Sequence, residues 1–170
     1  SSESRGLGDV YKRQVDLDNG AAGTVFDIDD ASTLTLADAA TVTTGTGGAV
    51  AFDGDSTGAL SIGTGAFTLD GTFNETQFTS VTTGADMTST STINFDNAVT
   101  MTQDLMLQGT TVSFGSTLNG TTADTEGLTV TGNGSFAANV GTGTRLEFLT
   151  VTGDTSIAAE INTANALNLT

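Results

Sequence analysis

The stretch LTVTGNGSFAANVGTGTRLEF, residues 128–148, is followed directly by LTVTGDTSIAAEINTANALNL, residues 149–169. Aligned at an offset of about 21 residues, the two stretches are identical at ten positions. Most of the differences are conservative, as in the aligned pairs Phe136 and Ile157, Val140 and Ile161, and Phe148 and Leu169. A tandem repeat of this length is typical of repeat architectures and constrains the fold more strongly than any local pattern does.

Each copy begins with Leu-Thr-Val-Thr, an alternation of apolar and polar residues that indicates a β-strand. Gly132 or Gly153 interrupts the alternation, and the following Asn133-Gly134 or Asp154 is typical of a turn. Two further short apolar pairs complete each copy. Three short strands and three turns within about 21 residues describe one coil of a solenoid, so we predict an all-β parallel β-helix.

The same coil can be followed towards the N-terminus, with decreasing regularity. Phe114 and Leu118 precede Phe136 and Val140 by nearly one repeat, and Phe95 precedes Phe114. Phe52 and Phe67 are too close for this spacing, so loop insertions are expected upstream. The chain then holds about seven irregular coils of roughly 21 residues, stacked about 4.8 Å apart into a rod on the order of 35 Å long.

Residues 1–14, SSESRGLGDVYKRQ, differ from the rest in composition, since they contain three of the four basic residues and the only tyrosine. Asp9 to Gln14 resemble a sequencing adapter that has been translated in frame. We therefore interpret residues 1–14 as an adapter-derived artefact and expect them to be disordered. The fold is expected to occupy residues 15–170, as a solenoid fragment without capping segments.

The charge balance excludes several kinds of partner. The formal net charge is −16, and Arg145 is the only basic residue after residue 14. A nucleic-acid partner is not expected because nothing neutralises phosphates, and an anionic membrane surface is disfavoured on the same grounds. No apolar run approaches the 18 or more residues of a membrane span, so no membrane insertion is expected. Arg145 is expected to pair with a nearby acid such as Glu147 or Glu160.

Catalysis is not expected from these residue types. The chain has no His, Cys or Trp, which removes thiol and histidine chemistry and the indole platforms that often hold sugars. β-Helical folds also include polysaccharide-active enzymes, so this function remains an alternative. Such enzymes need two poised carboxylates, or a base with cations around the substrate, and Arg145 is the only cation after residue 14. We predict no catalytic and no cofactor-binding residues.

Acidic residues near the N-terminus are weak candidates for loosely bound calcium, because Ca²⁺ prefers carboxylate oxygens. The candidates are Asp27, Asp29, Asp30, Asp53 and Asp55. The simpler interpretation is a solvated acidic edge of the solenoid, without a structural metal.

Outward-facing Thr-Xaa-Thr pairs form a candidate binding surface. Those with constant spacing in the sequence predict a surface threonine ladder of Thr129, Thr131, Thr150 and Thr152. A flat array of such pairs is how some ice-binding β-solenoids order water, so ice binding is one alternative function. Threonine is also a good exposed strand residue in any β-solenoid, without a ligand.

The repeat GLTVTGNGSFAANVGTGTRLEFLTVTG resembles repeats of large bacterial surface adhesins of the filamentous-haemagglutinin and autotransporter kind. The resemblance covers residues 112–170, and before that it is one of composition only. It implies a right-handed parallel β-helix stalk, exported to the bacterial cell surface or released. It also implies adhesion to host or environmental glycans or surface proteins through the parent protein, whose neighbouring repeats stack on this segment. A phage fibre segment is a further alternative with the same fold class.

Overall fold

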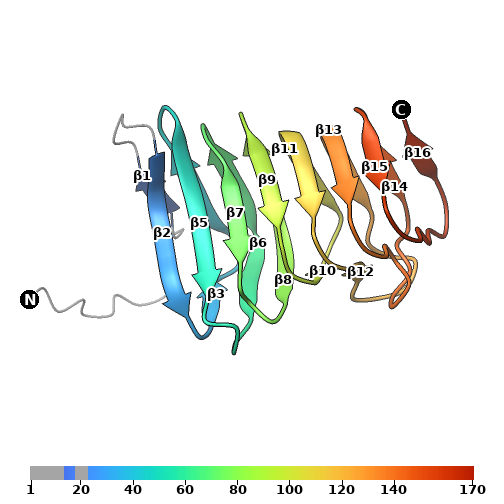
Figure 1. Cartoon of the computed structure of the whole chain (residues 1–170), viewed down its shortest axis with the longest axis horizontal. Helices are drawn as coiled ribbons and strands as arrows, with labels where there is room; N and C mark the ends of the chain where they lie inside the picture. The colour runs from blue at the N-terminus through green and yellow to red at the C-terminus, as the bar shows by residue number, and fades with distance from the viewer. Residues whose placement is uncertain (1–13, 18–22) are drawn as a thin grey trace, which may run out of the picture.

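The computed structural model describes residues 14–17 and 23–170 as a stack of short β-strands. Residues 1–13, nearly all of the segment that resembles an adapter, lie outside the described residues. Figure 1 shows the strands running across the long axis of the stack, from β1 near one end to β16 at the other. Among the described residues there is no helix, and hence none that is long and apolar enough to cross a membrane.

The strands are three to ten residues long. Their bounds are β1 Gln14–Leu17, β2 Gly23–Ala31, β3 Leu34–Leu36, β4 Ala40–Thr44, β5 Gly48–Gly54, β6 Leu60–Leu69, β7 Phe73–Thr76, β8 Val81–Ser89, β9 Thr92–Phe95, β10 Val99–Met101, β11 Leu105–Phe114, β12 Leu118–Gly120, β13 Leu128–Phe136, β14 Leu149–Val151, β15 Thr155–Ile157 and β16 Leu167–Leu169.

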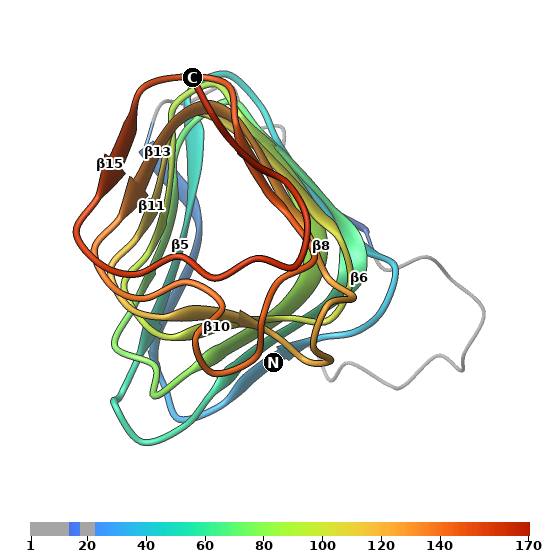
Figure 2. The same cartoon turned by 90° about the vertical axis from the view of Figure 1, so that its right-hand side faces the viewer.

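All pairings between these strands are parallel, and each joins one coil to the next. The coils repeat about every 21 residues and form a β-solenoid of about seven turns. In Figure 2, which looks along the solenoid from its C-terminal end, the chain runs counter-clockwise as it approaches the viewer. The winding is therefore right-handed, and the predicted fold class is confirmed.

The tube has three faces (Figure 2). Face A contains β1, β4, β14, β16, the later parts of β6 and β8, and the first parts of β11 and β13. Face B contains β2, β5, β7, β9, β15 and the later parts of β11 and β13. Face C contains β3, β10, β12 and the first parts of β6 and β8, and the isolated bridges at Val140 and Ile161 extend it.

Long strands bend at the corners, where the register of pairing shifts. Between β11 and β13 the shift lies after Gln108, and Gly132 occupies the corresponding corner of β13 with φ +119. A Cβ atom at Gly132 would lie 1.8 Å from the carbonyl oxygen of Gly109, so the two coils approach too closely for any side chain there. Glycine is required at this corner.

The core is a set of columns of apolar side chains that point into the tube. On face B, Phe95, Phe114 and Phe136 are in register, with ring centroids 5.5 Å apart in each stacked pair. Ile157 continues this column, and Leu118, Val140 and Ile161 form the predicted column on face C. Each large side chain buried in this way stabilises the fold by about 1.5–3 kcal/mol, which one isolated coil could not accumulate.

The irregular spacing upstream has a simple cause. Phe52 lies on face B, whereas Phe67 lies on face A and pairs with Met87 of the next coil. The short spacing of the two phenylalanines in the sequence therefore corresponds to the path from one face to another and not to the length of one coil. Side-chain hydrogen bonds between adjacent coils join residues that are 18 to 26 positions apart, so coil length varies around the mean.

Candidate functional site

Face A carries a column of hydroxyl side chains that is longer than the sequence predicted. Thr129 pairs with Thr150, and the amide of Gly132 donates a hydrogen bond of 3.2 Å to Oγ1 of Thr152. Register also aligns residues that the sequence spacing did not connect. The threonine column consists of Thr43, Thr68, Thr88, Gln108 and Thr131, which pair in register, and of Thr152, whose amide donates to the carbonyl of Val130.

The sequence missed the upstream half of this column because coil length varies there. Extra residues at the corners change the number of residues between equivalent positions, while the strand pairing restores their alignment. The signal was present in the Thr-Val-Thr of β4 and in Thr68 and Thr88, which follow Phe67 and Met87. Without the register, however, those threonines had no common period.

The neighbouring outward column of face A is chemically mixed. Its members are Thr41, Ala66, Asp86, Met106, Thr129, Thr150 and Asn168, with Asp86 and Met106 directly before the paired residues Met87 and Leu107. Asp86 and Met106 are both exposed, and Met106 exposes 56% of its surface. A charged and a large apolar side chain thus interrupt this column, while the threonine column beside it continues.

The five candidate calcium residues lie on or near face B at the N-terminal end. Asp27, Asp29 and Asp30 belong to β2 and are exposed. Asp53 accepts hydrogen bonds from Thr76 Oγ1 (2.7 Å) and Gln77 Nε2 (2.9 Å). Within residues 14–17 and 23–170, no group of three or more His, Cys, Asp or Glu side chains is arranged to hold a metal ion.

Asp55 takes part in a local turn. Its carboxylate accepts hydrogen bonds from the amide (2.9 Å) and the hydroxyl (2.6 Å) of Thr57. These bonds, the hydroxyl first, lower the pKa of Asp55. Calcium binding at the five residues stays a prediction, and the donors around Asp53 and Asp55 account for the present orientation of both carboxylates.

Arg145 pairs with Asp124, so the expected pairing with Glu147 or Glu160 is wrong. Nε and Nη2 of Arg145 lie 2.5 and 2.6 Å from the two carboxylate oxygens of Asp124. The hydrogen bonds to Arg145 lower the pKa of Asp124 and raise that of Arg145. The two residues belong to adjacent coils, and pairing across coils was not visible from distance along the sequence.

Glu75 is a buried carboxylate that the sequence analysis did not single out. On face B it occupies an inward position, in register with Phe52 and Phe95. It accepts hydrogen bonds from the amides of Asp96 (3.1 Å) and Asn97 (3.2 Å) and from the side-chain amide of Asn97 (2.8 Å). Burial raises its pKa despite these donors. The signal in the sequence was a charged residue at a position where the alternation in Phe-Asn-Glu demands an apolar one.

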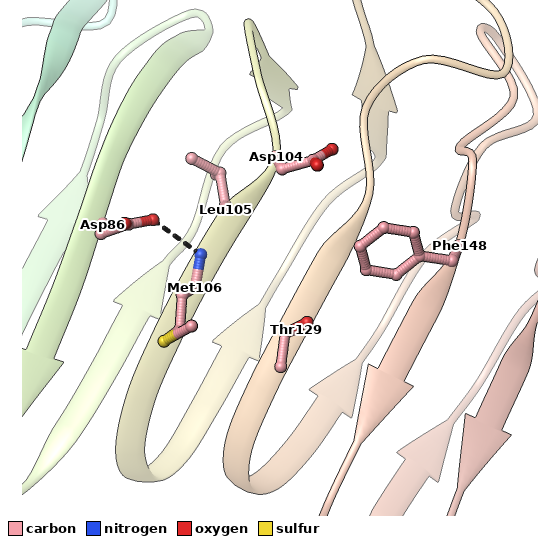
Figure 3. A pocket seen from close by; sticks show the side chains of 6 residues that line it. All are labelled: Asp86, Asp104, Leu105, Met106, Thr129 and Phe148. Atoms are coloured by element: carbon pink, nitrogen blue, oxygen red, sulfur yellow. Dashed lines mark hydrogen bonds between the residues drawn. The ribbon is translucent and has the colours of Figure 1, made fainter.

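A hollow of about 260 Å³ opens on face A beside the two columns. Figure 3 shows its lining, which consists of Asp86, Asp104, Leu105, Met106, Thr129 and Phe148. The amide of Met106 donates to Asp86 Oδ1 (2.8 Å), and the amide of Gly127 donates to Asp104 Oδ1 (2.8 Å). The ring of Phe148 packs on Gly127, where a Cβ atom would lie 2.1 Å from it. The hollow therefore combines apolar walls with two oriented carboxylates.

Comparisons of the chain with protein-family models, with curated proteins and with solved structures found no match.

Proposed function

We propose that this chain is a non-catalytic structural segment of a secreted or cell-surface β-solenoid stalk that extends an adhesive region of its parent protein. The observation that carries the proposal is the continuous apolar core, which runs through successive coils from Val42 to Val151. A continuous core with backbone hydrogen bonds from coil to coil favours stiffness along the axis, which a stalk requires.

Polar side chains add further links between coils. The amide of Thr64 donates to Asp38 (3.0 Å), that of Gly47 to Asp70 (3.1 Å) and that of Asp154 to Asn133 (3.0 Å). In the part of the chain that the structure describes, no buried side-chain nitrogen or oxygen lacks a hydrogen-bond partner. Turns that are hydrogen-bonded to the next coil restrict bending between coils, which supports a stiff stalk.

Stiffness can be measured from the distribution of distances between two spin labels. The chain has no cysteine, so a label attached to an introduced cysteine occupies a single site. We expect a narrow distance distribution for labels at Thr43→Cys and Thr152→Cys, which lie five coil steps apart, roughly 24 Å. The mean distance between labels at Thr68→Cys and Thr152→Cys should be shorter than that of the first pair by one coil step, about 4.8 Å. Broad distributions, or no difference between the pairs, would contradict a stiff stalk. Turnover of a polysaccharide by the purified chain would contradict its non-catalytic character.

Ice binding is a second candidate function, and the threonine column favours it. Threonines 43, 68, 88, 131 and 152 point outward from one face in adjacent coils, with Gln108 between them. Strand spacing places neighbouring members about 4.8 Å apart, a regular array of hydroxyl and methyl groups. Asp86 and Met106 interrupt the adjoining column and reduce the area of the array.

The test of ice binding is thermal hysteresis with a matched pair of variants on one strand. Thr131→Tyr places a bulky ring on face A, and Ser135→Tyr places the same ring on face B of β13. An ice-binding face A predicts hysteresis in the unmodified chain that Thr131→Tyr abolishes and Ser135→Tyr leaves intact. Absence of hysteresis in the unmodified chain, or equal loss in both variants, removes this function.

A further inference from the structure

The hollow on face A contains two large apolar side chains, Met106 and Phe148, that do not belong to the core. All the other phenylalanines belong to the core or pack against it, but Phe148 does not. Met106 is exposed on face A, whereas the other large exposed apolar side chains among the residues whose burial is described, Ile157, Leu167 and Leu169, lie in the last coil. Met106 and Phe148 come from different coils and line the same hollow (Figure 3).

The two carboxylates of the hollow are fixed in orientation by backbone amides of the next coil. Asp86 accepts from Met106 and Asp104 from Gly127, in each case through Oδ1. Oδ2 of each side chain takes part in no hydrogen bond that the structure describes. Each carboxylate therefore keeps acceptor capacity for a further donor, on Oδ2 and on the second lone pair of Oδ1.

We propose that this hollow binds the side chain of a lysine on a partner protein. The alkyl stem lies against Met106 and Phe148, and the ammonium group lies beside Asp104 and Asp86. Burying the stem on apolar groups while the charged end stays in water is the usual behaviour of lysine. The ring of Phe148 adds a cation–π attraction, and the net charge of −16 attracts cations to the surface.

The geometry favours lysine over arginine and over a sugar. A guanidinium binds best to both oxygens of one carboxylate, and Oδ1 of each carboxylate here already accepts from a backbone amide. An ammonium group has three donors that bind single oxygens of different residues. A neutral sugar would gain nothing from the net charge of the molecule. The proposal does not depend on the stalk function, because it concerns one local surface.

The probe for the test is Nα-acetyl-lysine-N-methylamide, titrated into the full chain and followed by amide NMR shifts. We expect saturable shifts confined to Met106, Gly127, Thr129 and Phe148, with a Kd on the order of 1–10 mM for so small a contact. The norleucine analogue, which keeps the stem without the charge, should bind about fivefold more weakly. Unsaturable shifts spread over the molecule, or equal binding of norleucine, would overturn the proposal.

Variants separate the hollow from the general acidity of the surface. Asp86→Asn combined with Asp104→Asn keeps both Oδ1 acceptors and should weaken lysine binding about fivefold. Met106→Thr removes the apolar wall and should weaken lysine and norleucine alike. Asp96→Asn, in the turn after β9, should change nothing. Equal weakening by Asp96→Asn overturns the proposal, as does tighter binding of methyl glucoside than of lysine at the same amides.

Discussion

At the scale of single residues, Glu75 is the clearest departure from the pattern of the solenoid. It is fully buried in a column of phenylalanines, and its oxygens accept three hydrogen bonds from the turn at Asp96 and Asn97. The donors favour the ionised carboxylate, but loss of water outweighs them and raises the pKa. Glu75 therefore connects β7 to the next coil at an electrostatic cost.

This cost predicts a pH dependence of stability. Because the pKa of Glu75 is higher in the folded chain than its ordinary value of 4.5, the folded state holds its proton more tightly than the unfolded state. The contribution of Glu75 to stability is fully present below pH 4.5 and is lost as pH rises through the raised pKa. The midpoint temperatures of thermal unfolding of the unmodified chain and of Glu75→Gln should therefore converge, or reverse in order, as the pH rises from 4 towards neutrality.

The matched control for Glu75 is Asp96→Asn, in the turn that Glu75 binds. Asp96 is exposed, and its Oδ1 accepts from the side-chain amide of Asn94, a bond that asparagine can keep. Asp96→Asn removes one negative charge from the same region without changing a buried group. A pH dependence that Asp96→Asn alters as strongly as Glu75→Gln would assign the effect to surface charge and not to burial.

At the scale of elements, the sequence predicted strands and turns well where repeats are regular. β13, β14 and β15 correspond to the alternations that the aligned copies show. It did not predict that β6, β8, β11 and β13 each continue around a corner onto a second face. The reason is physical: a glycine ends an alternation in the sequence equally well at a turn or at a bend in a continuous strand.

The corner at Gly132 provides a test of this geometry. Gly132→Ala should lower the free energy of unfolding by about 3 kcal/mol, because the backbone conformation disfavours a side chain and the carbonyl of Gly109 occupies the space. The measurement is the midpoint of urea unfolding. Gly143→Ala is the control, since its closest contact is the side chain of Asn119 at 3.0 Å, and it should cost less than about 1 kcal/mol. Equal effects would show that Gly132 is not special.

At the scale of the whole molecule, the sequence repeat predicted the architecture but not the threonine column or the hollow. About seven coils, parallel pairing and the columns through Phe114 and Leu118 were expected and are confirmed. The threonine column and the hollow depend on which residues of adjacent coils lie side by side. That relation depends on the exact length of every coil, and a change of one or two residues at a corner hides it from the sequence.

One consequence of the coil-to-coil pairing concerns how such a protein changes size. Leu128–Val130 pairs with Leu105–Leu107 on one side and with Leu149–Val151 on the other. Excision of residues 128–148 would bring Leu149–Val151 against Leu105–Leu107, which already accept a Leu-Thr-Val partner. Unequal recombination between repeats in the gene can therefore add or remove whole coils without disturbing the strand pairing. The length of such a solenoid is then set by the number of repeat copies.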